Sequence, residues 1–279
     1  MRILYLVLML FVATVGHARE KHALIIGIGQ YLDPNWSHIH ADADIEYAEK
    51  MLRANGFEDI RILKNEQATK QAIIEAFMRL ADECSIGDKV YIHFSGHGQQ
   101  ITDINGDEPY GLDETWAPYD AHPFPSADYH GENHLVDDEI NVLLAAIKQS
   151  VGKKGRIVVV VDACHSQSST REQSDNYRGF DKPFIIEDVK PLPLQASVPE
   201  EWITISACLD YQVNWEIVNP KMGKLTWSLY KLRNKLSRMS NRELEKSIDD
   251  IMRKYHSPLE QNPSITGVKD SEAVKDIFN

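Results

Sequence analysis

The chain has 279 residues, of which 43% are hydrophobic and 26% charged, and this composition excludes a disordered, collagen-like or small disulfide-stapled protein. The 42 Asp and Glu residues outnumber the 30 Lys and Arg residues, and the net charge of −12 argues against a surface that binds nucleic acid by neutralising phosphates. An acidic chain is better suited to a cationic partner. The length fits one domain of about 250 residues or two small ones.

The first 18 residues differ from all that follow. Arg2 precedes an almost wholly apolar run from Ile3 to Val15, and Gly16-His17-Ala18 ends it with small residues at the positions a signal peptidase reads. The run is shorter than the roughly 20 apolar residues that a membrane-spanning helix needs. We therefore expect a signal peptide at residues 1–18, no stable membrane anchor, and a secreted or periplasmic mature chain formed by residues 19–279.

Beyond residue 18, short apolar runs alternate with helical patterns, which is typical of βαβ units around a mostly parallel sheet. We expect strands at residues 23–28, 60–63, 90–94, 157–161, 202–208 and 263–267. We expect helices at residues 42–53, 69–84, 137–148, 225–236 and 241–256. Two long polar stretches, residues 98–136 and 165–200, lack this rhythm, and loops of that length are usually functional or mobile. No repeat, linker or low-complexity tract divides the chain, so we expect a single domain.

Two of the predicted strands end in residues that can carry chemistry. His97 and Cys164 both fall beyond the carboxyl end of a strand, where sites form in parallel sheets. A thiol needs a nearby base to become a thiolate, and the free N–H of Gly98 could bind an oxyanion. Side chains two apart on a strand point the same way, so Ser95 shares a side with His97, and Asp162 with Cys164.

The residues alone leave other interpretations open. A buried cysteine is normally a small apolar side chain, and a single histidine is normally a hydrogen-bonded core or surface residue. His93 and His97 are four residues apart, which would suit a metal on a helix. Along a strand that spacing separates them by roughly 13 Å, so we expect no chelate there.

A longer series of motifs runs in order through residues 21–267. It comprises Ser95-Gly96-His97-Gly98, the acidic stretch from Asp107 to Asp120, Asp137-Asp138-Glu139, Asp162-Ala163-Cys164-His165-Ser166, Ile205-Ser206-Ala207-Cys208 with Gln212 and Glu216, Gly223 to Ser228, and Gln261-Asn262-Pro263. In these motifs the chain resembles the metacaspases, caspase-like cysteine peptidases, and among them the bacterial type. The resemblance implies an α/β fold, a caspase-like three-layer α/β/α sandwich around a mostly parallel sheet. It also implies His97 and Cys164 as the catalytic dyad, and cleavage after basic residues rather than after Asp.

A pocket for a basic substrate side chain needs a fixed carboxylate, and Arg in particular favours one that meets its planar fork of donors. Asp162 stands two residues before the expected nucleophile and can face such a pocket, and Ser95 stands in the same relation to His97. In the family a third pocket residue comes from the start of the first long helix, where the spacing selects Asp44 over Asp42. A helix-capping or turn-stabilising role is the alternative for Asp162.

Two residues depart from the family pattern. Gln167 stands where the family usually has Gly, which could reshape the rim of the active site. Arg171 stands where calcium-activated members have Asp, and a cation there would repel a metal.

The acidic loop at residues 103–120 carries six carboxylates: Asp103, Asp107, Glu108, Asp113, Glu114 and Asp120. An EF-hand is excluded because Glu108 occupies the position that needs Gly and no helix precedes the loop. A solvated acidic loop is the favoured interpretation. A calcium site at Asp113, Asp137 and Asp138 is the alternative, and no organic cofactor is required.

We therefore expect a secreted cysteine endopeptidase that cleaves proteins or peptides after Arg or Lys. Cys164 would attack the scissile carbonyl, His97 would activate the thiol, and the amides of Gly98 and Cys164 would hold the oxyanion. A catalytically silent caspase-fold binding module, or a Cys-dependent amidohydrolase acting on small amides or cell-wall peptides, is the alternative.

Two further expectations concern covalent changes to the chain itself. The long polar stretch at residues 165–200 contains Arg171, Arg178 and Lys182, and we expect the enzyme to cut itself there because exposed loops are preferred sites of nicking. The chain has three cysteines, and an oxidising compartment would favour pairing Cys84 with Cys208 if the geometry allows it.

Overall fold

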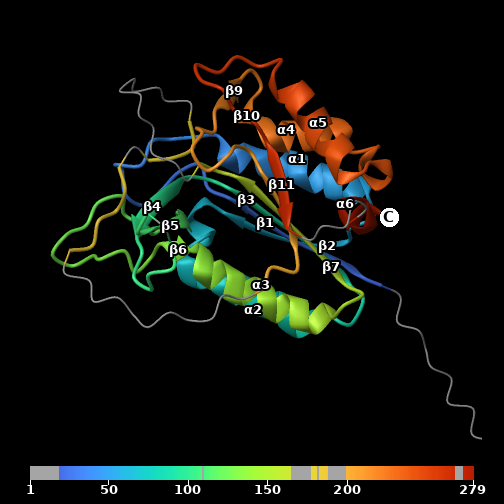
Figure 1. The fold of residues 1–279 in the computed structure, drawn as a ribbon, viewed down its shortest axis with the longest axis horizontal. Helices are drawn as coiled ribbons and strands as arrows, with labels where there is room; N and C mark the ends of the chain where they lie inside the picture. The colour runs from blue at the N-terminus through green and yellow to red at the C-terminus, as the bar shows by residue number, and fades with distance from the viewer. Residues whose placement is uncertain (1–18, 109, 165–176, 181, 188–198, 268–272) are drawn as a thin grey trace, which may run out of the picture.

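The computed structural model describes residues 19–108, 110–164, 177–180, 182–187, 199–267 and 273–279. The expected signal peptide at residues 1–18 lies outside these ranges, as do Gln167 and Arg171. A six-stranded sheet with the strand order β11-β8-β7-β3-β1-β2 forms the centre of the fold (Figure 1). Its strands are β1 (Lys21–Gly27), β2 (Asp59–Lys64), β3 (Lys89–Ser95), β7 (Arg156–Asp162), β8 (Ile203–Ser206) and β11 (Ser264–Gly267). Only the edge strand β11 runs antiparallel to its neighbour in this sheet.

The two central strands have the composition expected of strands covered on both faces. β3 is buried along its whole length, and β7 is buried except at its first residue. β7 contains the run of β-branched residues from Ile157 to Val161, whose side chains pack well on a pleated surface that no water reaches. The strands predicted from the apolar runs are therefore confirmed, with ends that shift by one or two residues.

Helices cover both faces of the sheet and make the three-layer α/β/α sandwich that the resemblance implied (Figure 1). One face carries α1 (Ala41–Ala54), α4 (Lys224–Leu232), α5 (Asn241–Met252) and the short α6 (Ala273–Phe278), and the other carries α2 (Lys70–Glu83) and α3 (Asp137–Val151). Alternate residues of β1 feed the two cores, since Ile25 joins the first and Leu24 the second. Thr69 caps α2 by accepting a hydrogen bond from the amide of Ala72 at 3.2 Å.

The polar stretch at residues 98–136 differs from the prediction. It holds a three-stranded sheet formed by β4 (Gly98–Thr102), β5 (Leu112–Trp116) and β6 (Leu135–Val136). These strands are short, and they bury polar side chains such as Gln99 and Thr115, so they lack the apolar alternation that marks a strand. A second small sheet, β9 (Glu216–Val218) with β10 (Lys221–Gly223), was also not predicted.

Two helices end earlier than predicted. The helix expected at residues 225–236 stops at Leu232, and a 3₁₀ turn, η2 (Leu236–Arg238), follows it. The helix expected at residues 241–256 stops at Met252. Another 3₁₀ turn, η1 (Asn65–Gln67), connects β2 to α2. Among the described residues, no helix is long and apolar enough to cross a bilayer.

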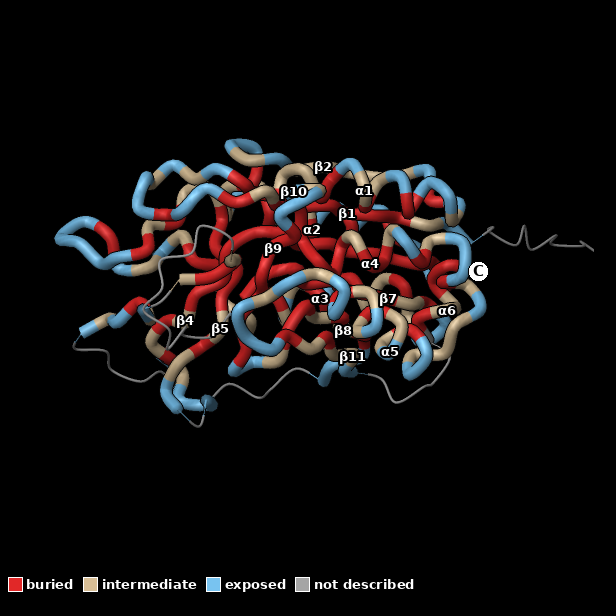
Figure 2. The backbone as a smooth tube through the Cα atoms, turned by 90° about the horizontal axis from the view of Figure 1, so that it is seen from above, coloured by how far each residue is buried: buried red, intermediate tan, exposed pale blue. Residues whose placement is uncertain are grey.

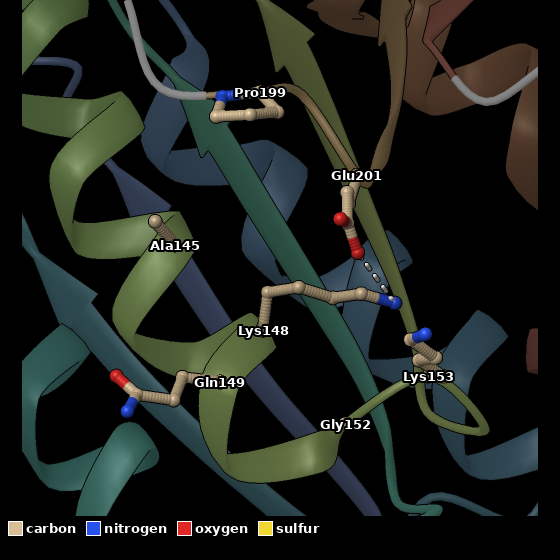
Figure 3. Close-up of a pocket in the computed structure, with 7 residues that line it drawn as sticks. All are labelled: Ala145, Lys148, Gln149, Gly152, Lys153, Pro199 and Glu201. Atoms are coloured by element: carbon tan, nitrogen blue, oxygen red, sulfur yellow. Dashed lines mark ion pairs between the residues drawn. The ribbon is translucent and has the colours of Figure 1, made fainter. Parts of the chain in front are cut away.

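A surface pocket lies beside the carboxyl end of α3 (Figure 3). Gly152 and Lys153 line it just before β7 begins, and Lys148 pairs with Glu201 across it at 3.8 Å. Cys164 follows the other end of β7. The pocket is therefore remote from Cys164, which is buried as His97 is. Figure 2 shows that the backbone of the central strands is mostly buried.

Candidate active site

The ends of β3 and β7 bring the expected catalytic residues to the same edge of the sheet. The two strands are parallel neighbours, and Ser95 lies directly opposite Asp162 in their register. His97 and Cys164 each follow two residues later, and both are buried, with exposed fractions of 0% and 1%. The parallel pairing thus juxtaposes four residues that are about 65 positions apart in sequence.

His97 is held by the loop that joins β1 to α1. Its ring stacks on Trp36 with centroids 5.2 Å apart, and its backbone amide donates to the hydroxyl of Tyr31 at 2.7 Å. Its Nε2 lies 2.8 Å from the carbonyl oxygen of Ser37, which can only accept, so Nε2 carries the proton and Nδ1 keeps its lone pair. Burial lowers the pKa of His97 to about 4, although the hydrogen bond to Ser37 opposes it. The imidazole is therefore neutral at pH 7 and can accept a proton.

Cys164 lies in a small apolar cluster with Cys208 and Trp215. Its Sγ is 3.3 Å from the carbonyl oxygen of Gln212. A hydrogen bond with Cys164 is the main cause that raises the pKa of Cys208, and burial adds to it. Cys208 therefore remains a neutral thiol beside Cys164.

The expected disulfide is absent, because all three cysteines are free. Cys84 belongs to the core between the sheet and helices α2 and α3, whereas Cys208 lies beside Cys164. The two thiols expected to pair thus belong to separate clusters, and the geometry does not allow the bond.

The three pocket residues expected from the sequence lie together, and a fourth joins them. Asp44 comes from α1, Ser95 from β3, Asp162 from β7 and Glu216 from β9, and all are 3% exposed or less. The hydroxyl of Ser95 donates to Asp44 at 2.5 Å. Glu216 occurs in the motif series, but no role was assigned to it from the sequence.

The side chain of Arg178 fills this acidic pocket and is itself fully buried. Its Nη1 lies 2.7 Å from Asp44 and 3.2 Å from Asp162, and it donates to the hydroxyl of Ser95 at 2.6 Å. Its Nε and Nη2 both donate to Oε1 of Glu216, at 3.0 and 2.9 Å. Three carboxylates and a hydroxyl thus surround one guanidinium, which satisfies a buried charge that would otherwise be very costly.

Burial alone would raise the pKa of Asp162, but Arg178 and hydrogen bonds from Asn214 and Thr226 outweigh it and hold the pKa below its usual value. Oδ2 of Asp162 accepts from the amide of Thr226, in the first turn of α4, at 2.8 Å. Asp162 therefore both accepts a hydrogen bond from the first turn of α4 and contacts Arg178. Burial raises the pKa of Asp44 to about 6, although Arg178 opposes the shift.

The backbone at Tyr177 and Arg178 is extended and pairs with the backbone at Asn214 and Trp215. The amide of Arg178 donates to the carbonyl of Asn214 at 2.9 Å, and Tyr177 pairs with Trp215 in an antiparallel bridge. The amide of Cys164 donates to the carbonyl oxygen of Arg178 at 2.7 Å. Gly98, the second amide expected to hold an oxyanion, begins β4 opposite Trp116.

No pattern in the sequence indicated that Arg178 fills the pocket, because it stood out only, together with Lys182, as a basic residue of the long polar stretch at residues 165–200. Lys182 is exposed, and Arg171 lies outside the described residues. Ser37 and Tyr31 were missed as well, because a hydroxyl or carbonyl in a loop carries no pattern. Arg178 pairs with carboxylates that are far apart in the sequence. Its role could be predicted only if it were already known that these carboxylates lie together in the fold.

The acidic loop gathers carboxylates that could hold a metal. Asp103, Asp107 and Asp113 offer oxygen atoms within 4.8 Å of one another. Burial raises the pKa of Asp113 to about 8, and the next largest contribution comes from Asp137. Asp138 also raises the pKa of Asp113, but of the three residues expected from the sequence only Asp113 belongs to the group of carboxylates with metal-ligand spacing. Such an all-oxygen donor set fits a hard cation such as calcium.

Comparison with known proteins places the chain in a family. Residues 20–273 match the caspase domain family. Metacaspase-1B of Aspergillus fumigatus is 30% identical over 156 residues, which cover 53% of this chain and 35% of that protein. Metacaspase-1B of Aspergillus terreus is 31% identical over 157 residues, which cover 53% and 38%. The matched region thus spans little more than a third of these relatives.

Solved structures share the architecture. The crystal structure of a protein from Geobacter sulfurreducens has a TM-score of 0.65 and 24% identity, and the match covers 91% of this chain and 96% of that one. Caspase-1 from Spodoptera frugiperda has a TM-score of 0.63 and 12% identity, with 90% of each chain covered. At these sequence identities the structural similarity establishes the fold alone. The match of residues 20–273 to the family model establishes the family. The chain therefore belongs to the caspase domain family.

Proposed function

We propose that this chain is a cysteine endopeptidase that cleaves peptide bonds after basic residues, using His97 and Cys164. One observation carries the proposal: Arg178 of the same chain lies in the acidic pocket, and its carbonyl oxygen is held by the amide of Cys164. A peptide that binds in this way presents its carbonyl carbon to the thiol. The site thus has both a means of recognising a basic side chain and a means of activating the bond that follows it.

The proposed mechanism begins with proton transfer. Nδ1 of His97 accepts the thiol proton of Cys164, and the thiolate adds to the carbonyl carbon of the substrate. The amide of Cys164 stabilises the oxyanion, with Gly98 as the proposed second donor. The imidazolium then protonates the leaving amine, and water hydrolyses the thioester. The carbonyl of Ser37 supports the mechanism because it fixes the imidazole tautomer that the first step needs.

The charge of the pocket supports specificity for Arg and Lys. Asp44, Asp162 and Glu216 together provide more negative charge than one substrate cation carries, so a neutral or acidic side chain would leave buried charges unpaired. Glu216 binds two donors of one guanidinium, and an ammonium offers no such fork. The pocket thus favours Arg over Lys.

The same pocket argues against the other candidate functions. A small neutral amide would leave the three carboxylates without a partner, so an amidohydrolase of uncharged substrates fits poorly. A silent binding module would not need a carbonyl held beside a thiol. Action outside the cytoplasm is part of our proposal, and it rests on the apolar run before residue 19.

A fluorogenic peptide library tests the proposal on the purified chain without its first 18 residues. We expect the cleavage profile to peak at Arg, with Lys second. Cys164→Ala and His97→Ala should each abolish cleavage, because residues that act as one unit lose function together. Cys84→Ala is the matched control, since Cys84 is also a buried thiol but packs on the far side of the sheet, and it should retain activity. A peak at Asp or at an apolar residue, or activity that persists in Cys164→Ala, would contradict the proposal.

A further inference from the structure

A buried cluster of His22, Cys84 and Asp88 takes no part in the proposed mechanism. His22 lies on β1, Cys84 ends α2 and Asp88 directly precedes β3, and none of the three is more than 9% exposed. Each side chain offers a donor atom, and these atoms lie within 4.8 Å of one another. The cluster lies at the start of β3 and Ser95 at its end, so roughly 20 Å of strand separates it from the candidate active site.

The imidazole of His22 is oriented as a metal-binding imidazole would be. Its Nδ1 lies 2.7 Å from Oδ2 of Asp59, and because a carboxylate accepts, Nδ1 carries a proton. Its Nε2 is buried and makes no hydrogen bond within the described part of the chain. A carboxylate that holds one ring nitrogen and aims the other is the usual support of a histidine that binds a metal. Nε2 of His22 is therefore the atom that awaits a ligand.

Asp88 faces this nitrogen and is fixed by the backbone. Its Oδ1 accepts from the amide of Glu20 at 2.9 Å, and its Oδ2 accepts from the amide of Ser85 at 2.8 Å. Oδ2 lies 3.4 Å from Nε2 of His22. Two donor atoms bound at about 2.1 Å to a tetrahedral zinc ion lie about 3.4 Å apart. The two atoms thus already have the separation of zinc ligands.

The surroundings of the third donor, the Cys84 thiol, favour a cation. Burial raises the pKa of this thiol, and the carboxylate of Asp88 raises it further. Asp59 and Glu20 act in the same direction, and Arg61 opposes them. The thiol thus lies among more negative than positive groups, and a bound cation would offset their repulsion.

We propose that His22, Cys84 and Asp88 bind one zinc ion, with Glu20 as the fourth ligand. Imidazole nitrogen, thiolate sulfur and carboxylate oxygen are the donors that zinc takes, whereas calcium and magnesium prefer oxygen alone. Oε2 of Glu20 lies 3.8 Å from Nε2 of His22, and its side chain is exposed and can turn toward the ion. On binding, the thiol proton of Cys84 passes to the solvent and the thiolate bonds to the metal.

The zinc ion would join three segments of the fold. It would connect the start of β1 to the end of α2 and to the residue before β3. Because the cluster lies at the opposite end of the sheet from Cys164, the ion would stabilise the fold and take no part in cleavage. The inference therefore goes beyond the proposed function and does not depend on it.

The test uses the purified Cys164→Ala chain, which lacks the catalytic thiol as a competing ligand. After treatment with a chelator, the chain is titrated with Zn²⁺ in a calorimeter, and a second sample is titrated with Co²⁺ and followed by absorbance. We expect one zinc ion per chain, a sulfur-to-cobalt charge-transfer band, and the strong visible bands of tetrahedral cobalt. The Tm should rise by about 5 °C or more when zinc is about a hundredfold above its Kd.

Three variants on the Cys164→Ala background assign the ligands. Cys84→Ser keeps the shape of the side chain and should lose the charge-transfer band and the rise in Tm, while circular dichroism shows that it is folded. His22→Ala should lose them too. His256→Ala is the matched control, because His256 is exposed and follows α5, and it should bind zinc as the parent chain does.

Other outcomes would overturn the inference. A charge-transfer band that survives Cys84→Ser, or zinc binding with no such band in cobalt, would place the metal elsewhere in the chain. No zinc binding by the folded Cys164→Ala chain would mean that a doubly protonated His22 forms an ion pair with Asp59 and Asp88. Since every sample lacks the catalytic thiol, none of these results bears on the proposed peptidase activity.

Discussion

The amide of Cys164 donates to the carbonyl oxygen of Arg178 at 2.7 Å, while the side chain of Arg178 is fully buried among carboxylates. A single residue is thus fixed at both ends, by its side chain in the pocket and by its carbonyl beside the thiol. Because Asp162 and Cys164 are two residues apart on the same strand end, the pocket and the nucleophile cannot move independently. Recognition of the side chain and alignment of the scissile bond are therefore one event.

Glu216→Gln should reduce the preference for Arg more than it reduces activity in general. Glu216 accepts from two nitrogen atoms of the guanidinium, a charge-assisted pair of hydrogen bonds that a lysine cannot reproduce. We expect kcat/KM for Arg peptides to fall by about 2 kcal/mol, and that for Lys peptides by clearly less. Paired kinetics on Arg and Lys versions of one peptide measure the ratio. Glu75→Gln, an exposed carboxylate on α2, is the control, and an unchanged Arg to Lys ratio in Glu216→Gln would refute the role of this residue.

Asp162→Asn should affect both stability and catalysis, because Asp162 has two partners. Its Oδ2 accepts from the amide and the hydroxyl of Thr226 at the start of α4, and its Oδ1 lies 3.2 Å from Arg178. Weakening the cap should lower the free energy of unfolding by about 1 kcal/mol. Losing the charge should lower kcat/KM for Arg peptides by about 2 kcal/mol.

Thiol labelling of Cys164 and urea unfolding separate the two effects of Asp162→Asn. Labelling should proceed as in the wild type, which would show that the nucleophile is intact. A variant with unchanged kcat/KM and reduced stability would mean that Asp162 only caps the helix.

The sheet and its helices could be predicted because burial on one or both faces leaves a period in the sequence. The run from Ile157 to Val161 and the capped helix after Thr69 are examples. The small sheet of β4, β5 and β6 could not be predicted, because its strands bury polar residues such as Thr115, whose hydroxyl donates to the carbonyl of Gln99. Polar residues satisfied by tertiary contacts look like loop residues in a sequence.

The site divides in the same way. Ser95, His97, Asp162 and Cys164 could be placed together because parallel neighbouring strands bring their carboxyl ends to one edge. Glu216 lies on a short hairpin, and its place in the pocket depends on a hydrogen bond from the amide of His40, 176 residues away, just before α1. No local pattern encodes such a contact. The occupant, Arg178, could be found only once the acids that surround it were known to meet.

The affinity for Arg peptides should fall as the pH drops toward about 6, with little change in kcat. Burial raises the pKa of Asp44 to about 6 when the pocket holds a guanidinium, so Asp44 is protonated and loses its charge below that pH. The pKa of His97 is about 4, so the base stays neutral over the same range. Because the guanidinium lowers the pKa of Asp44, that pKa is higher in the empty pocket, and KM should rise by about tenfold as the pH falls toward 6 and then level off. Steady-state kinetics across this range, with Asp44→Asn as the matched variant, should show a pH-independent and high KM for the variant. A fall in kcat with constant KM would mean that protonation of His97, and not of Asp44, causes the loss of activity at low pH.

Calcium should stabilise the protein through Asp113. Without calcium, the buried carboxylate of Asp113 should lower the free energy of unfolding. Asp113 is 3% exposed, and burial, with Asp137 and Asp103 next, raises its pKa to about 8. An acid whose pKa is raised by folding stabilises the folded state at low pH, and this contribution is lost as the pH rises toward 8. In a chelator at pH 8 we therefore expect Asp113→Asn to have a higher Tm than the wild type, by roughly 3 °C for about 1 kcal/mol.

Calcium at about 1 mM, in the range of extracellular sites, should reverse that order. The cation would favour the ionised carboxylate, so the Tm of the wild type should rise, protons should be released on binding, and Asp113→Asn should not respond. Glu114→Gln is the matched control, because neighbouring residues on a strand point to opposite faces and Glu114 is not among the clustered carboxylates. A wild-type Tm that is unchanged by calcium at pH 8, where the carboxylate can ionise, would identify these residues as a solvated acidic loop. A response in both wild type and Asp113→Asn would place the metal elsewhere.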